Sequence, residues 1–147
     1  MKVLILLLSL CTTALVFWFC KTPKYTADSL PQKQLRWGKG GGFVGRETLH
    51  LLLENGQIFK PGDEAGKMVE TTGTRRAKAK KLFKLLETTG IQNLDFQHPG
   101  NTYKFMDIVA GETVKRIAWG DAQYPVDASV EDLYRQLEAL VAEENGK

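Results

Sequence analysis

The sequence has 147 residues, of which 43% are hydrophobic and 25% are charged. These fractions are typical of a globular protein and argue against intrinsic disorder and against a membrane protein with many spans. The formal net charge of +3 is too small to indicate a nucleic-acid partner. Both cysteines, Cys11 and Cys20, lie in the apolar N-terminal segment, so the remainder is expected to have no disulfide and no cysteine-bound metal.

Residues 1–20 are predicted to be a signal peptide or a membrane anchor. Residues 3 to 20 carry no charge. As a helix they would extend about 27 Å, just short of the about 30 Å of a bilayer's hydrocarbon core. This apolar run is longer than that of a usual signal peptide. The segment therefore predicts export or anchoring in a membrane.

The end of this segment leaves two kinds of attachment open. A polar sequence follows Cys20 abruptly, as in a bacterial lipoprotein whose cysteine is lipidated. Phe19 departs from the small residue expected there, so a retained helix is the alternative, and cleavage to a soluble product ranks third. Lipidation at Cys20 implies a domain outside the cytoplasm. If the helix is retained, the two lysines after it, Lys21 and Lys24, outnumber the one before it, Lys2. This excess of positive charge would favour a domain on the cytoplasmic side.

Residues 21–34 are polar, include Pro23 and Pro31, and show no apolar period. This composition predicts an extended tether. The folded part is therefore expected to span residues 35–147 as a single domain, a size that supports one hydrophobic core.

The domain is predicted to begin with three short strands. Gly40 to Gly42 can take positive φ and close the first connection. Residues 43–53 alternate, and their odd positions are expected to be buried. Asn55-Gly56 predicts a hairpin turn into a strand at residues 57–60, with a further edge strand at 67–70.

The period then changes to that of a helix. Residues 74–89 carry apolar side chains at helical spacing, with Thr74 as the N-cap and Gly90 as the stop. A second hairpin follows at residues 103–110 and 113–119. The last element is a helix from about Ser129 to residue 143. Its expected cap is Ser129 with Asp132, and its apolar stripe is Val130, Leu133, Tyr134, Leu137, Leu140 and Val141.

These elements predict an α+β domain. The order is strands, helix, strands, helix, with one antiparallel sheet made of two hairpin units and both helices on one of its faces. Side chains on the alternating or helical apolar positions form the expected core. The five chosen to test it are Leu51, Phe83, Phe105, Leu133 and Leu137.

No motif in the sequence predicts catalysis. The two histidines, His50 and His98, lie in different kinds of segment, and neither has a second ligand at a recognisable zinc spacing. The glycine run lacks the Lys-Ser/Thr ending of a phosphate-binding loop. The chain is therefore expected not to be an enzyme, with no catalytic residue, no metal ligand and no cofactor.

The glycine-rich segment is a candidate recognition loop for a protein partner. Glycines let a backbone approach a partner closely, and aromatic side chains supply contact area. The residues of this candidate loop are Trp37, Lys39, Gly40, Gly41, Gly42, Phe43 and Arg46. The simpler interpretation, a turn between strands, is favoured by the pattern alone.

The first helix is strongly basic and is a candidate contact for an anionic surface. Near anionic lipid each basic residue contributes about 1 kcal/mol, which matters for a tethered domain. The candidate residues are Arg76, Lys80, Lys81 and Lys84. The simpler interpretation is again favoured: two solvated helix faces, one basic and the C-terminal one acidic, joined by weak ion pairs.

Several motifs resemble a group of small bacterial envelope lipoproteins without an assigned function. The resemblance covers nearly the whole domain. It rests on the motifs at residues 36–38, 40–45, 53–59, 98–105 and 117–120, which include Arg-Trp-Gly and Ala-Trp-Gly. It implies a membrane-tethered binding or structural module of the envelope.

The Gly-Gly-Phe-x-Gly motif at residues 41–45, followed by strands, helix, hairpin and helix, is similar to emfourin. Emfourin is a proteinaceous inhibitor of thermolysin-like metalloproteases. This likeness implies an alternative function, protease inhibition. It assigns no inhibitory residue to the present chain.

Overall fold

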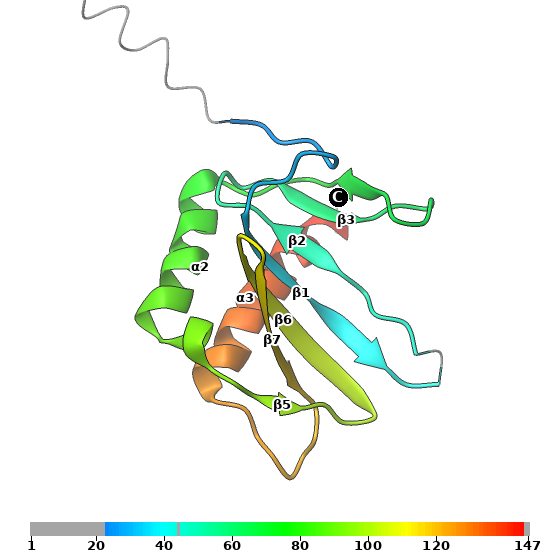
Figure 1. Cartoon of the computed structure of the whole chain (residues 1–147), viewed down its shortest axis with the longest axis vertical. Coiled ribbons are helices and arrows are strands. Elements are labelled where there is room, and N and C mark those ends of the chain that lie inside the picture. The colour runs from blue at the N-terminus through cyan, green and yellow to red at the C-terminus, as the bar shows by residue number, and fades with distance from the viewer. Residues whose placement is uncertain (1–22, 44, 146–147) are drawn as a thin grey trace, which may run out of the picture.

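The computed structural model describes residues 23–43 and 45–145 (Figure 1). Within them lie seven strands, two α-helices and one short 3-10 helix. The strands are β1 (Lys33–Gly41), β2 (His50–Leu52), β3 (Ile58–Pro61), β4 (Met68–Glu70), β5 (Gln97–His98), β6 (Thr102–Ala110) and β7 (Thr113–Trp119). The helices are α2 (Arg76–Thr88), η1 (Ile91–Asn93) and α3 (Ala128–Asn145).

The described strands form a single mixed sheet in the order β4-β3-β2-β1-β6-β7-β5. The predicted α+β class and the order strands, helix, strands, helix are confirmed. The prediction of a wholly antiparallel sheet of two hairpin units is wrong. After α2 and η1 the chain reaches the far edge of the sheet, where β5 runs parallel to β7, with Gln97 beside Ala118 and His98 beside Trp119.

β1 is the central strand on which the sheet is built. It pairs with β6 along its whole length, from Lys33 opposite Ala110 to Gly41 opposite Thr102. On its other side it pairs with β2, which is much shorter than the strand predicted at residues 43–53. Residues 45–48 are exposed, because they are a glycine and three polar residues and so have no apolar side chain to bury.

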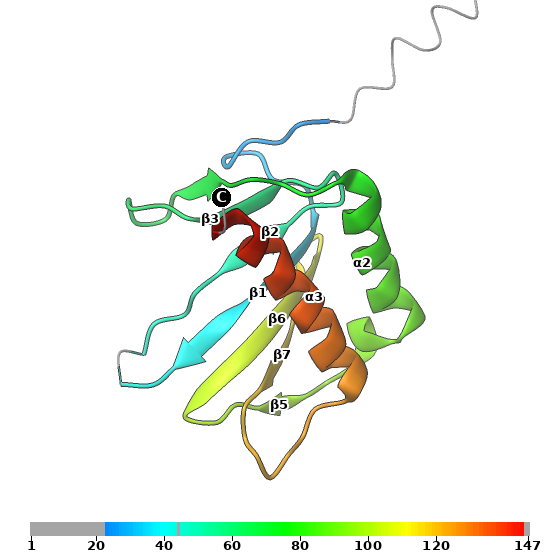
Figure 2. The same cartoon turned by 180° about the vertical axis from the view of Figure 1, so that it is seen from behind.

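Both helices pack on the same face of the sheet, where α3 crosses the strands and α2 lies beside it (Figure 2). Alternate strand residues such as Leu35, Trp37 and Met106 point toward them into the larger cluster of buried side chains. The predicted stripe of the first helix is buried there: Ala79, Leu82, Phe83 and Leu86. The C-terminal helix contributes Val130, Leu133, Tyr134, Leu137 and Leu140.

The five side chains chosen to test the predicted core are all buried. Leu51, Phe83, Phe105, Leu133 and Leu137 are each at most 3% exposed. Burying a side chain of this kind contributes about 1.5 to 3 kcal/mol, so such positions dominate the stability of the domain.

The helices begin at other residues than predicted. α2 begins at Arg76, and its N-cap, Arg75, makes no side-chain capping bond. α3 begins at Ala128 and is capped by Asp127, whose Oδ1 accepts hydrogen bonds from the Ser129 Oγ and, at 2.8 Å, from the Ser129 backbone N–H. The bonds from Ser129 lower the pKa of Asp127.

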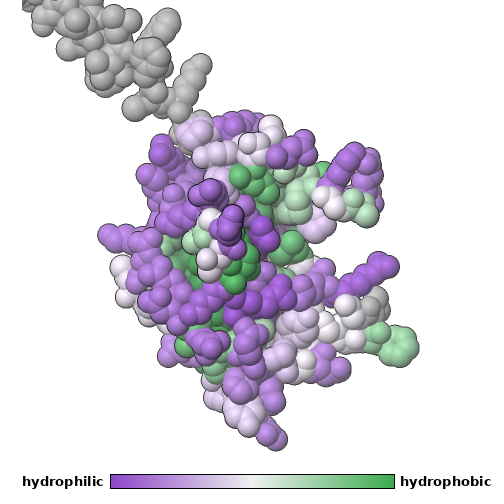
Figure 3. All heavy atoms as spheres, in the orientation of Figure 1, coloured by the Kyte–Doolittle hydropathy of each residue, from purple (hydrophilic) through white to green (hydrophobic). Residues whose placement is uncertain are grey.

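The opposite face of the sheet has a smaller core of its own. Leu51, Leu53 and Phe59 are buried there, which is why burial in β2 does not simply alternate. The segment of residues 23–31, called the strap here, covers them. Packed against this core are Tyr25, Ala27, Leu30 and Met68. Figure 3 shows hydrophilic side chains over much of this face, with hydrophobic patches between them.

Hydrogen bonds fix the strap, which is part of the predicted extended tether, to the sheet. The Tyr25 N–H donates to Gln57 Oε1 at 2.7 Å, and Gln57 Nε2 donates to the Tyr25 carbonyl at 2.9 Å. The first strand of the described residues begins at Lys33, before the predicted domain start at Leu35. Composition could not show this, because the side chains that bond the strap, Asn55 and Gln57, lie far along the chain.

Candidate functional site

The candidate recognition residues divide between β1 and the connection that follows it. Trp37, Lys39, Gly40 and Gly41 belong to β1 and are not in a loop. The β1–β2 connection, of which the structure describes residues 42–43 and 45–49, holds the others: Gly42, Phe43 and Arg46. The prediction of one continuous loop around the glycines is therefore wrong.

Trp37 is a core residue and not an exposed recognition residue. Its side chain is 0% exposed and stacks on His50 with ring centroids 5.3 Å apart. Lys39 lies on the same face of β1, where its Nζ is 2.5 Å from Glu138 of α3. Lys39 remains exposed, whereas Trp37 is buried.

Gly40 is closely covered by neighbouring side chains within the sheet. A Cβ at this position would lie 2.6 Å from the Tyr103 ring and 2.9 Å from Cγ of Glu47. These two side chains meet over Gly40, where the Tyr103 hydroxyl donates to Glu47 Oε1 at 2.8 Å. Gly40 has no side chain, so the space above it on β1 is filled by the Tyr103 ring from the neighbouring strand β6.

Gly41 turns the chain toward the β5–β6 turn. Its φ is +85°, and a Cβ there would lie 2.1 Å from the Asn101 carbonyl oxygen. The next residue, Gly42, donates its N–H to the same oxygen at 2.7 Å. These contacts fix the start of the connection against the turn.

Phe43 is the exposed aromatic side chain of this region. It is 108% exposed, so its side chain is not covered by any other described residue. Arg46 is exposed as well, whereas Thr48 returns to β1 and donates its N–H to the Lys39 carbonyl at 2.8 Å. The connection projects from one end of the sheet, at the lower right of Figure 1. The connection thus carries an exposed aromatic side chain, Phe43, between two residues, Gly42 and Thr48, whose backbones are hydrogen-bonded to the rest of the domain.

A hollow of about 520 Å³, called the sheet-end hollow here, lies at the same end. Residues of β1, β6, the end of β7 and α3 line it. They are Lys39, Gly40, Thr102, Tyr103, Lys104, Trp119, Gly120 and Glu131. Three glycine-containing motifs far apart in the sequence, at residues 40–45, 98–105 and 117–120, are thus brought together.

A fixed carboxylate forms part of this hollow. Glu131 lies 2.9 Å from Lys104 Nζ and accepts a hydrogen bond from Trp119 Nε1 at 2.7 Å. Burial by itself raises the pKa of Glu131, but the hydrogen bonds from Lys104 and Trp119 outweigh it and lower the pKa. Because the carboxylate is already paired, its first role is to hold α3 on the end of the sheet.

An ion-pair network on the strap side of the sheet was not predicted. Asp107 is 5% exposed and accepts two hydrogen bonds from Arg116, at 2.7 and 2.9 Å. Arg116 also bonds Glu47 at 2.8 Å, and these carboxylates raise its pKa. The one signal in the sequence was an aspartate inside an apolar strand; nothing indicated its partner on β7.

The basic side chains of α2 do not converge on one site. Arg76, Lys80, Lys81 and Lys84 are all exposed, and only the first two line a hollow, described below. The acidic helix α3 is joined to the sheet by ion pairs. Its carboxylates Glu131 and Glu138 pair with Lys104 and Lys39 of the sheet.

The remaining predictions concern metals, membranes and lipidation. Within the described part of the chain, no group of three or more His, Cys, Asp and Glu side chains is placed to hold a metal ion. His98 stacks on Tyr124, with ring centroids 4.2 Å apart. No helix of residues 23–43 and 45–145 is long and apolar enough to cross a membrane. Cys20 lies outside the described residues.

No protein-family model matches the chain, and no curated protein matches it in sequence. The site must therefore be judged by its own chemistry. It offers an exposed aromatic side chain, a neighbouring exposed arginine and a hollow between strand ends, which are features suited to binding.

Proposed function

We propose that this chain is a non-enzymatic binding module of the bacterial cell envelope. Residues 1–20 attach it to a membrane, and the β1–β2 connection engages a protein partner. The observation that carries the proposal is the complete exposure of Phe43 beside Gly42, which has positive φ, at the end of the central strand. Aromatic side chains that become buried on association are the usual energetic anchors of protein interfaces.

The base of the connection supports this role. Gly42 is bonded to the β5–β6 turn at 2.7 Å, and Thr48 is bonded to β1 at 2.8 Å, so both ends of the connection are fixed to the sheet. A preorganised base lowers the entropy cost of binding. Arg46 adds an exposed positive charge, which favours a partner surface with a carboxylate beside an apolar pocket.

Site-specific photocrosslinking in the full-length chain tests the proposal. A photoreactive phenylalanine analogue replaces Phe43 in cells, and a matched chain carries it at Val114, which is 54% exposed on β7. We expect a discrete crosslinked protein from position 43 and none from position 114. Absence of an adduct at position 43, or the same adducts at both positions, would refute the proposed contact.

The second candidate function is inhibition of thermolysin-like metalloproteases. One observation favours it: Phe43 on the β1–β2 connection is a fully exposed apolar side chain, and such a side chain can enter a substrate-binding cleft. The full chain in detergent should then inhibit such a protease near stoichiometry. Phe43→Ala should weaken inhibition about 30-fold or more, as expected for an interface anchor, whereas Arg135→Ala on α3 should not.

A panel of secreted metalloproteases separates the two functions. Inhibition that depends on Phe43 favours the inhibitor. No inhibition of any member, together with a crosslink at position 43, favours a binding module with another partner.

A further inference from the structure

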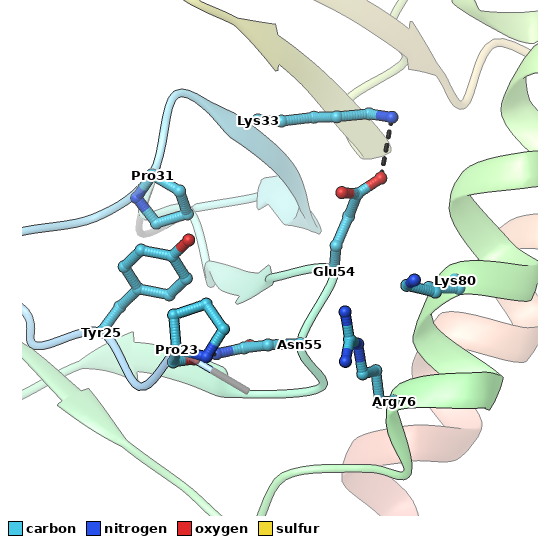
Figure 4. A pocket seen from close by; sticks show the side chains of 8 residues that line it. All are labelled: Pro23, Tyr25, Pro31, Lys33, Glu54, Asn55, Arg76 and Lys80. Carbon is cyan, nitrogen blue, oxygen red and sulfur yellow. Dashed lines mark hydrogen bonds and ion pairs between the residues drawn. The ribbon is translucent and has the colours of Figure 1, made fainter. Parts of the chain in front are cut away.

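A second hollow lies where the strap passes the first turns of α2. It has a volume of about 250 Å³ and is called the cationic hollow here. The strap, the turn after β2 and α2 contribute its walls. Figure 4 shows the lining side chains: Pro23, Tyr25, Pro31, Lys33, Glu54, Asn55, Arg76 and Lys80.

The charges of the hollow are mainly positive. Lys33, Arg76 and Lys80 supply three cations against the single carboxylate of Glu54, a net charge of +2. Lys33 is held by Glu54 at 2.8 Å and by Glu87 at 3.1 Å. The heads of Arg76 and Lys80 are directed from α2 toward Glu54 (Figure 4). An anion entering here would meet two cationic heads from one helix.

The opposite wall is aromatic and apolar. The Tyr25 ring and the rings of Pro23 and Pro31 stand across from the helix (Figure 4). Rings of this kind provide flat, rigid contact surface, and a tyrosine combines an apolar body with a polar tip, as is common at the interface of a membrane. The hollow thus combines a cationic side with an apolar side.

The strap fixes this hollow next to the membrane attachment. Asn55 Nδ2 donates to the Pro23 carbonyl at 2.7 Å, so the chain is held to the domain from the first described residue. Only two residues separate Pro23 from the end of the apolar segment at residue 20. Fully extended, that part of the chain spans about 10 Å. This is also about one Debye length, so surface charges act on the hollow.

We propose that the cationic hollow binds the phosphate group of an anionic lipid and so orients the domain on the membrane. The inference rests on the membrane attachment in the proposed function. Arg76 and Lys80 bind the phosphate, and the Tyr25 side of the hollow contacts the glycerol region. The exposed Lys81 and Lys84, outside the hollow, add attraction to the same surface.

Hydrogen exchange of the full chain in lipid nanodiscs tests the inference. One disc contains phosphatidylcholine alone, and the other contains phosphatidylglycerol in addition. The amides of residues 23–33 and 74–82 should exchange at least about fivefold more slowly in the anionic disc, since one basic side chain near an anionic surface contributes a factor of about this size. The exchange of β6, in the middle of the sheet, should not change between the discs.

Charge reversal decides whether the hollow is responsible. Arg76→Glu with Lys80→Glu should abolish the added protection, whereas the double variant Arg135→Glu with Lys60→Glu, which changes the net charge equally outside the hollow, should keep it. Equal protection in both discs, or loss in both double variants, would overturn the inference. Protection by inorganic phosphate in the uncharged disc would do so too, by showing a site for free phosphate.

Failure of the attachment itself gives a different result. A chain that does not co-elute with either disc overturns membrane attachment and this inference with it. A chain that co-elutes with both discs but shows no added protection in the anionic disc overturns only the lipid site. Neither result bears on the crosslink from position 43.

Discussion

Replacing Gly38 with alanine tests whether the glycines of β1 serve packing. Gly38 is buried, and a Cβ there would lie 1.8 Å from the Thr48 carbonyl oxygen and 3.1 Å from the Phe105 ring. Ordinary contacts begin at 3.4 Å, so residue 48 must move away from β1 by about 1.6 Å, the difference between 3.4 and 1.8 Å. The atom in the way is backbone, which no rotamer change can relieve.

The cost of this movement follows from the hydrogen bonds that it would break. Two of them join the β1–β2 connection to β1 at this point, Thr48 N–H to the Lys39 carbonyl at 2.8 Å and Lys39 N–H to Thr48 Oγ1 at 3.1 Å. Each contributes about 1 kcal/mol, and the overpacking adds about 1 to 3 kcal/mol. The expected loss is about 3 to 5 kcal/mol, a large part of the about 5 to 15 kcal/mol that stabilises a typical domain.

Urea unfolding of the full chain in detergent, followed by circular dichroism, measures this loss. The matched control is Gly45→Ala, where φ is +61° but no atom lies within 4 Å of the added Cβ. Left-handed backbone alone costs about 1 to 2 kcal/mol. If Gly38→Ala destabilises no more than Gly45→Ala, close packing against residue 48 is not the reason for glycine in β1.

Two further predictions concern the strap and the start of α3. Gln57→Leu removes both bonds to Tyr25, so the stability should fall by about 1 to 3 kcal/mol, and trypsin should cleave after Lys24 faster than in the unchanged chain. Asp127→Ala should lower the melting temperature at neutral pH. Because bonds from Ser129 lower the folded-state pKa of Asp127, its stabilisation is complete above the ordinary value of 3.8. The difference between the two chains should vanish as the pH falls through that lowered pKa; a constant difference would show that the carboxylate charge is not involved.

The core positions were predictable because they depend on local periodicity. The apolar stripe at Ala79, Leu82, Phe83 and Leu86 follows a period of 3.6 and can be buried on only one side of a helix. The alternation in residues 103–110 likewise places Met106 and Phe105 on opposite faces. Patterns of this kind constrain burial whatever the partner element turns out to be.

The site was predicted less well because it depends on contacts between distant segments. The run Gly40 to Gly42 indicated a turn, yet Gly40 lies in β1, where it pairs with Tyr103 of β6. The pairing of Asp107 with Arg116 depends on the register of β6 against β7, which no motif specifies. The burial of Trp37 agrees with the alternation of residues in a strand. The glycines next to it, however, also suited a tryptophan exposed in a loop, so the sequence did not decide between the two.

The positions of the two proposed contacts follow from the direction of β1. The strap enters beside its first residue, Lys33, and the β1–β2 connection leaves after its last, Gly41. A strand of nine residues spans about 30 Å, so the hollow that Lys33 lines and the connection that carries Phe43 lie at opposite ends of β1. A domain held on a membrane by the cationic hollow would therefore direct Phe43 away from the lipid, toward proteins of the envelope. Accessibility to a membrane-impermeant reagent at cysteines introduced at Phe43 and Tyr25 tests this arrangement, since it requires labelling at the first position and protection at the second.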